Sequence, residues 1–160
     1  MPTRYYEQKD FADLASVGSF ADLFLIALRV LRRMPQGHTI QVCGPISTGG
    51  KGSVEANHEV FEKAVAYLVK KQCLVFNQLP FEDALKRLYT KWKKSNEGYC
   101  MPILDELYLK LFQSGYIHEL RFLPGWESSF GARWEYTYAR KHGLIISHFD
   151  LHWEEDALAA

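Results

Sequence analysis

The stretch His38-Thr-Ile-Gln-Val-Cys-Gly-Pro-Ile-Ser-Thr-Gly-Gly-Lys-Gly-Ser53 decides the fold. Its first six residues predict a strand, and the Gly-Pro pair that follows them ends it. Ser53 is a preferred N-cap for a helix over residues 54–71. The short apolar run at residues 73–76 is typical of a strand covered on both faces. Strand, loop, helix and strand make a βαβ unit, which predicts parallel strands joined by a right-handed crossover.

Similar patterns continue on both sides of this unit. We expect further helices over residues 20–34, 80–94, 102–113 and 131–142, and strands over residues 117–123 and 144–149. This order predicts an α/β fold: a small parallel, flavodoxin- or Rossmann-like sheet with helices on both faces. We expect a single domain over residues 1–160, in which an N-terminal helix at 20–34 precedes a nucleotide-binding-like core at 38–150. The first ten residues and the tail from Trp153 are expected to be loose.

Composition limits the function classes. The chain has 160 residues, 48% of them hydrophobic, which suits one folded domain. Its 19 basic and 19 acidic residues cancel, which argues against a protein that grips duplex nucleic acid. The three cysteines show no CxxC spacing, so we expect neither a disulfide framework nor a metal site. Reduced cysteines suit a cytoplasmic protein, and we expect that location. The longest apolar stretch, at residues 23–28, is too short to cross a membrane.

Two loops follow strands where open parallel sheets bind ligands, beyond the carboxyl ends. The loop at residues 44–52 brings glycines and hydroxyls to the start of a helix, a combination that suits a phosphate. The alternative is a tight connection that needs a positive φ at Gly49 or Gly50. This loop is not a P-loop, because Gly50 stands where that motif requires lysine.

The second loop covers residues 124–131 and leads into a helix that carries Glu135. Ser128 or Ser129 could cap this helix, and its dipole would favour an ionised Glu135. The alternative for Glu135 is an ordinary acid near a helix start. Trp126 is a candidate either for core packing or for stacking on a base.

These two loops also carry a family resemblance. The runs Cys43-Gly-Pro-Ile-Ser-Thr-Gly-Gly50 and Ser128-Ser-Phe-Gly-Ala-Arg-Trp-Glu135 resemble the nucleoside 2-deoxyribosyltransferase-like family, which includes deoxynucleoside 5′-monophosphate N-glycosidases. The resemblance covers roughly residues 38–149. It implies that Glu135 is the nucleophile and that an aspartate handles the leaving base, with Asp105 the nearest match and Asp83 a weaker one. The substrate-binding residues that we assign on this basis are Gly44, Ile46, Ser47, Thr48, Gly49, Gly50, Asn77, Ser129 and Gly131.

The resemblance implies cleavage or transfer of the N-glycosidic bond of a nucleoside or nucleoside 5′-monophosphate, without a cofactor. The glutamate would form a glycosyl-enzyme, which water or a second base would resolve. One alternative is a phosphoribohydrolase of the cytokinin-activating type, although its Gly-Gly-x-Gly-Thr run is absent. Another is a non-catalytic nucleotide-sensing or interaction domain.

The N-terminal helix adds an expectation about assembly. Apolar residues spread around much of its circumference, among them Phe20, Phe24, Leu25 and Ile26. A helix of this kind is buried on more than one side. We therefore expect it to pack on the sheet and on a second subunit, in a two-fold homodimer.

Overall fold

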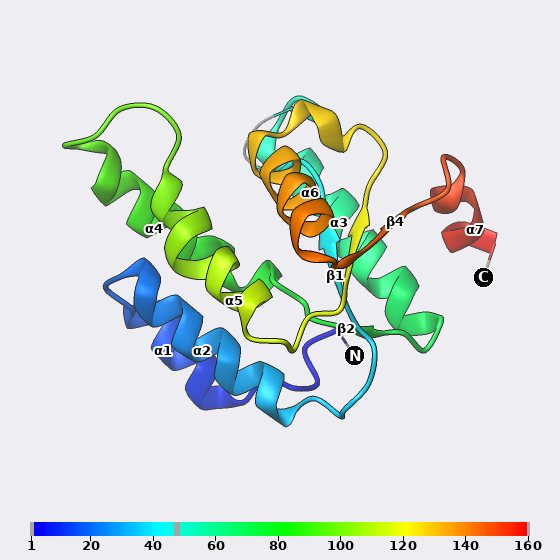
Figure 1. Cartoon of the computed structure of the whole chain (residues 1–160), viewed down its shortest axis with the longest axis horizontal. Coiled ribbons are helices and arrows are strands. Elements are labelled where there is room, and N and C mark those ends of the chain that lie inside the picture. Colours follow the sequence, from blue (N-terminus) through cyan, green and yellow to red (C-terminus); the bar gives the residue numbers. More distant parts are fainter. Residues whose placement is uncertain (1, 47–48, 160) are drawn as a thin grey trace. The chain divides into compact units, whose positions relative to one another are not determined.

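The computed structural model describes residues 2–46 and 49–159, which divide into two compact units (Figure 1). The first unit contains Pro2 and residues 37–77 and 117–159. The second contains Thr3–Gln36 and Gln78–Tyr116. Each unit is thus assembled from separate stretches of the chain. The expectation of a single domain stays a prediction.

The first unit is built on a sheet of four strands. They are β1 (Thr39–Cys43), β2 (Leu74–Val75), β3 (Glu119–Phe122) and β4 (Ile145–His148), and their order across the sheet is β2-β1-β3-β4. All three pairings are parallel, with Cys43 opposite Phe122 and Phe122 opposite His148. The predicted α/β class with a small parallel sheet is therefore confirmed.

Two helices make the crossovers of this sheet. Helix α3 (Val54–Lys70) joins β1 to β2, and α6 (Phe130–His142) joins β3 to β4, in the opposite direction across the sheet. Because such crossovers are right-handed, α3 and α6 cover opposite faces of the sheet. The connections diverge between β1 and β3, so the switch point of the topology lies between the carboxyl ends of these two strands.

Side-chain caps explain where α3 and α6 begin. The hydroxyl of Ser53 accepts a hydrogen bond from the Ala56 amide at 3.1 Å, as the sequence predicts. The hydroxyl of Ser129 accepts one from the Ala132 amide at 3.3 Å. Each cap satisfies an amide that would otherwise lack a partner in the first turn. Both helices therefore start at defined residues on the carboxyl side of the sheet.

The second unit is helical in its described residues. It contains α1 (Gln8–Ser16), α2 (Phe20–Arg33), α4 (Glu82–Lys93), the π-helical segment η2 (Ile103–Tyr108), α5 (Leu109–Gln113) and the short turn η1 (Leu79–Phe81). Helix α2 packs against α1, η2 and α5 and buries Leu23 and Ala27 completely. On the same helix Leu25 is 59% exposed, so this helix also keeps an apolar residue at the surface.

Both ends of the chain are more ordered than the sequence suggests. Helix α1 (Gln8–Ser16) begins within the expected loose lead-in, and the expected fraying tail contains α7 (Trp153–Ala159). Helix α7 is held by its buried Trp153, whose ring lies 5.8 Å from that of Tyr67 on α3 and 5.1 Å from that of Phe149. Tertiary contacts that local patterns do not reveal therefore order these ends. No helix among the described residues is both long enough and apolar enough for a membrane crossing.

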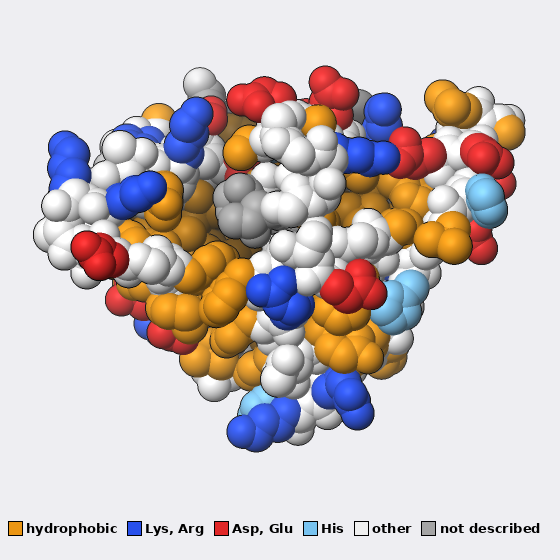
Figure 2. Space-filling view, turned by 90° about the horizontal axis from the view of Figure 1, so that it is seen from above, with side chains coloured by type: hydrophobic (Ala, Val, Ile, Leu, Met, Phe, Trp, Pro, Cys, Tyr) orange, Lys and Arg blue, Asp and Glu red, His pale blue; other side chains and the backbone are white. Residues whose placement is uncertain are grey.

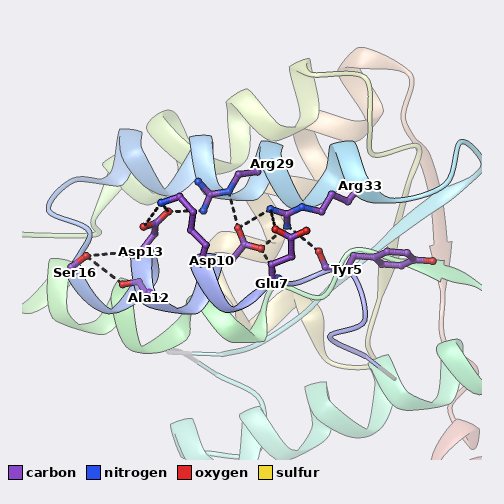
Figure 3. A network of polar contacts seen from close by, with 9 residues as sticks. Tyr5, Glu7, Asp10, Ala12, Asp13, Ser16, Arg29 and Arg33 are labelled. Carbon is purple, nitrogen blue, oxygen red and sulfur yellow. Dashed lines mark hydrogen bonds and ion pairs between the residues drawn. The ribbon is translucent and has the colours of Figure 1, made fainter.

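Helix α1 is held to α2 by a buried ion network (Figure 3). Asp10 has no exposed surface, and it accepts hydrogen bonds from Arg29 Nε at 2.7 Å, Arg33 Nη1 at 2.5 Å and the Glu7 amide at 2.8 Å. Burial by itself raises the pKa of Asp10, but these hydrogen bonds outweigh it and hold the pKa below its ordinary value. Arg29 also donates to Asp13 at 2.6 Å, so α1 is attached at two successive turns.

Replacement of Asp10 by Asn is expected to destabilise the protein by about 3 kcal/mol, because it leaves two arginines beside a neutral group. The pKa of Asp10 is lower in the folded state than in the unfolded chain. The ionised carboxylate therefore contributes to the free energy of unfolding above the pKa of the unfolded chain, and this contribution is lost as the pH falls through the pKa of the folded state. Urea denaturation at pH 7 checks the prediction. Asp105→Asn, at an exposed site of the same unit, serves as control and should change stability by less than about 0.5 kcal/mol. Equal stability of the two variants would contradict it.

Candidate functional site

The two loops singled out in the sequence lie in contact at the switch point of the sheet. The Gly50 amide, in the loop after β1, donates to Ser128 Oγ in the loop after β3 at 2.9 Å. The same hydroxyl donates to the Gly125 carbonyl at 2.8 Å. A side chain at Gly49 would collide with Ser128, and its Cβ would lie 2.6 Å from the Ser128 carbonyl oxygen. Backbone contact between the loops therefore requires glycine at position 49.

Asn57 gives the first loop its shape. It lies in the first turn of α3 with 3% of its surface exposed. Its Nδ2 donates to the carbonyls of Ile46 and Gly49, both at 3.1 Å, and its Oδ1 accepts from the Lys51 amide at 2.8 Å. Sequence reasoning missed this residue. The available signal was a polar side chain at an inward position of a helix whose other inward positions are apolar.

The glycines of the first loop support the tight-connection alternative. Gly49 and Gly50 have φ angles of 71° and 66°, a region that favours glycine. The Gly50 amide already has a partner in Ser128, so it is not open to a phosphate in this conformation. Gly44 lets the ends of β1 and β3 approach, since a Cβ there would lie 3.0 Å from the Leu123 side chain. Two further predicted ligands, Ser47 and Thr48, lie outside the described residues.

Glu135 lies in the second turn of α6, and only 7% of its surface is exposed. Its side chain interacts with Cys43, the last residue of β1, and its Oε2 has no hydrogen-bond partner among the described residues. Burial raises the pKa of Glu135 to about 7, against a smaller lowering by the hydrogen bond with Cys43. This carboxyl group is thus buried close to the end of β1, and its hydrogen bonds compensate poorly for the loss of solvation.

The alternative for Glu135 and one expectation about its charge are therefore wrong. It is not an ordinary acid at a helix surface, because the side chain is buried. Nor is its carboxyl group kept fully ionised at neutral pH by its place near the start of α6, because burial raises its pKa to about 7. A carboxyl group with a pKa of about 7 holds a mixture of both protonation states near pH 7. Such a perturbed group at a ligand-binding edge is a candidate functional residue.

The start of α6 contributes the other assigned residues of the second loop. Ser129 is buried and caps the helix, and Gly131 follows in the first turn. The Ser129 oxygen accepts from the Ala132 amide, which leaves its O–H proton able to serve a second acceptor. Trp126 is packed rather than open on both sides, because its ring stacks on Tyr136 of α6 at 4.5 Å.

The remaining assigned residues lie elsewhere. Asn77 is buried just after β2, in the first unit. Asp105 and Asp83 are both exposed and belong to the second unit, on η2 and α4. Glu135 and its expected acid partner therefore belong to different units, and their pairing stays a prediction. Throughout residues 2–46 and 49–159, no three or more His, Cys, Asp and Glu side chains are arranged to hold a metal ion.

Comparison with known proteins places this region in a family. Residues 38–148 match the family described as a domain of unknown function, DUF4406. The chain belongs to this family. The DUF4406 match begins one residue before β1 and ends with the last residue of β4, so it includes the whole sheet, both loops and Glu135. No curated protein and no solved structure matches the chain.

Gly49→Ala is expected to destabilise the protein more than Gly52→Ala. Both residues have a positive φ, which costs an alanine about 1 kcal/mol, but only position 49 would also collide with Ser128. No atom lies within 4 Å of a Cβ at Gly52, so this variant isolates the backbone cost. Urea denaturation should give a loss at least about 1 kcal/mol larger for Gly49→Ala. Equal losses would show that the contact between the loops does not constrain position 49.

Glu135→Gln is expected to become more stable relative to the wild type as the pH rises. Because folding raises the pKa of Glu135 from 4.5 to about 7, the folded state holds a proton that the unfolded state has released. Wild-type stability should therefore fall between these two values, by about 3 kcal/mol in total, and the glutamine variant should not share this fall. Thermal and urea unfolding from pH 4 to pH 8 measure the difference. Glu127→Gln, at an exposed position, is the control, and parallel profiles for all three proteins would refute the buried titration.

Proposed function

We propose that this chain cleaves or transfers the N-glycosidic bond of a nucleoside or nucleoside 5′-monophosphate, with Glu135 as the nucleophile. The observation that carries the proposal is the buried Glu135 carboxyl group, whose Oε2 has no partner within the part of the chain that the structure describes, near the switch point between β1 and β3. Open α/β sheets bind their ligands at such points. The resemblance of both loops to the deoxyribosyltransferase-like family supports the same assignment.

The chemistry requires the ionised form of Glu135. Its carboxylate attacks the anomeric carbon, the bond between carbon and base nitrogen breaks, and the base leaves with the bonding electrons and takes a proton from solvent water or from the expected acid, Asp105. The resulting glycosyl ester is then attacked at the same carbon, by water in hydrolysis or by a second base in transfer. A weakly solvated carboxylate with a pKa of about 7 suits a nucleophile that works near neutral pH.

We place the phosphate of a monophosphate substrate at the start of α6. This helix has 13 residues, and the N-terminus of such a helix attracts anions through its free amides and its dipole. The Ser129 hydroxyl retains a proton to donate there. This assignment differs from the cradle first expected in the loop after β1, where Gly50 already donates to Ser128.

One observation favours a non-catalytic alternative. Asp105 is exposed and belongs to the other unit, so no acid partner for Glu135 has been identified within the first unit. A domain that only senses a nucleotide needs no such partner. The phosphoribohydrolase alternative has no comparable observation in its favour.

Two wider expectations complete the proposal. We propose a two-fold dimer through α2, on the basis of its exposed Leu25. We also propose a cytoplasmic location, because Cys43, Cys73 and Cys100 are all free thiols, as in a reducing compartment.

The surface charges bear on the kind of ligand. On the face of the molecule in Figure 2, Lys and Arg side chains are dispersed among acidic and apolar ones, an arrangement that suits a small ligand better than a nucleic-acid duplex.

The test is the release of free base from a panel of nucleosides and 5′-monophosphates, followed by chromatography. Glu135→Gln should lower the rate by roughly 10³-fold or more, because glutamine cannot act as the nucleophile. Glu127→Gln, at an exposed position in the loop that precedes α6, should match the wild type. The wild-type rate should rise with pH through a midpoint near the pKa of Glu135, about 7, since only the ionised form reacts.

Two outcomes would contradict the proposal. Undiminished cleavage by Glu135→Gln would show that another group is the nucleophile. Failure of the wild-type protein to cleave any member of the panel, while it still binds nucleotides in calorimetry, would favour the sensing domain.

A further inference from the structure

A groove on the surface of the first unit lies between α3 and α7. Its lining residues are Lys63, Ala66, Tyr67, Lys70, Trp153, Glu154, Ala157 and Leu158. The four residues from α3 recur at helical spacing and therefore share one face of that helix. The groove has a volume of about 240 Å³, below the roughly 300 Å³ at which pockets for small molecules begin. It suits an inserted apolar side chain better than a ligand of nucleotide size.

Apolar groups at this groove are left open to solvent. Trp153 is buried and packs on Tyr67, with their rings 5.8 Å apart, but Leu158 on the same helix is 88% exposed. Leu151, two residues before α7, is 81% exposed. Among the described residues no large hydrophobic side chain is more exposed than these two. Figure 2 shows apolar and acidic side chains together over α7. Exposed leucines beside a partly apolar groove are typical of a surface that binds another protein.

The two walls of the groove carry opposite charges. Lys63 and Lys70 lie two turns apart on α3, about 10 Å along the helix axis, and both are exposed. Glu154 lines the α7 wall, and the exposed Glu155 follows it on the same helix. Within residues 2–46 and 49–159, Lys63, Lys70 and Glu154 form no ion pair. The charges that line the groove are therefore available to a partner.

We propose that this groove is the interface with a second copy of the chain: Leu158 of each copy enters the groove of the other, and the acidic α7 of each faces Lys63 and Lys70 of the other. A two-fold rotation sets each wall against the opposite wall, so a groove with one basic and one acidic wall is complementary to itself. A purely acidic or purely basic partner would meet like charges on one wall. This inference goes beyond the proposed function, and it concerns a surface separate from the one proposed on α2.

An exchange of charges tests this interface. In one variant, Lys63→Glu and Lys70→Glu make both walls acidic, and in another, Glu154→Lys and Glu155→Lys make both walls basic. Neither variant should associate with itself, because like charges then meet across the two-fold axis. An equimolar mixture of the two should form dimers, because each wall again meets its opposite. Sedimentation velocity at about 50 μM, a concentration at which stable interfaces are occupied, measures the association.

Every protein in this test also carries Leu25→Asp, which removes the contact proposed through α2. The matched control is Lys91→Glu with Lys94→Glu, which makes the same change of net charge as the acidic variant at exposed positions of the second unit. This control should form dimers with itself as readily as the protein with Leu25→Asp alone. It should bind the basic variant more weakly than the acidic variant does, although the net charges in the two mixtures are equal.

A second measurement needs no change of charge in the groove. Unlabelled copies and copies labelled with heavy nitrogen are mixed and treated with a carbodiimide, which joins carboxylates to lysines in contact. Cross-links of mixed isotope between Glu154 and Lys63 or Lys70 should appear. Leu158→Asp should raise the dissociation constant of the dimer at least about tenfold, because a buried leucine is lost from each copy.

Three outcomes would each overturn the proposal: a monomeric protein with Leu25→Asp alone, cross-links of this pair confined to single copies, or no dimers in the mixture of acidic and basic variants. Circular dichroism establishes that each variant is folded before its association is measured. If a charge variant fails to fold, the isotope cross-links decide, since they use a chain with an unaltered groove.

Discussion

The contact between the loops after β1 and β3 is the constraint on which the candidate site depends. The two crossovers leave these adjacent strands in opposite directions, which opens the carboxyl edge of the sheet between them. The loops meet across this opening through Gly49, Gly50 and Ser128, with no room for a side chain at position 49. Asn57 holds the first loop from the side of α3, and Ser129 fixes the start of α6 from the other side. The helix that carries Glu135 is thereby positioned against the end of β1.

A buried carboxyl group is costly, and its retention here is informative. No cation of the described residues offsets the desolvation of Glu135, so burial raises its pKa. Asp10 in the second unit shows the contrasting solution, since it is even more buried but is held ionised by two arginines. Ionisation of Glu135 therefore lowers the stability of the fold, whereas ionised Asp10 contributes to stability. An acid that serves only stability would be expected to resemble Asp10.

The sequence predicts the frame of the first unit well and its fine contacts poorly. The strand at β1, the caps Ser53 and Ser129 and the order of elements follow from local patterns, because turn residues and hydrophobic periodicity are local properties. Helices α1 and α7 were missed because Arg29, Arg33 and Tyr67, which hold them, are distant in sequence. The two loops were correctly identified, but their mutual contact could not be predicted, since it depends on how β1 and β3 pair. For the same reason the burial of Glu135, and hence its raised pKa, could not be read from its place in a helix.

The interleaved course of the chain sets a limit on how the family region can be isolated. The matched stretch, residues 38–148, contains all of the sheet but only the later segment of the second unit, residues 78–116. Helix α2 lies outside that stretch, yet it packs on η2 and α5, where Leu104, Leu107 and Leu111 are each 1% exposed. A fragment cut at the family boundaries would leave the apolar side of η2 and α5 without this cover, and exposed surfaces of that kind promote aggregation. A fragment that keeps these leucines covered must therefore begin before α2, well ahead of the first residue of the family match.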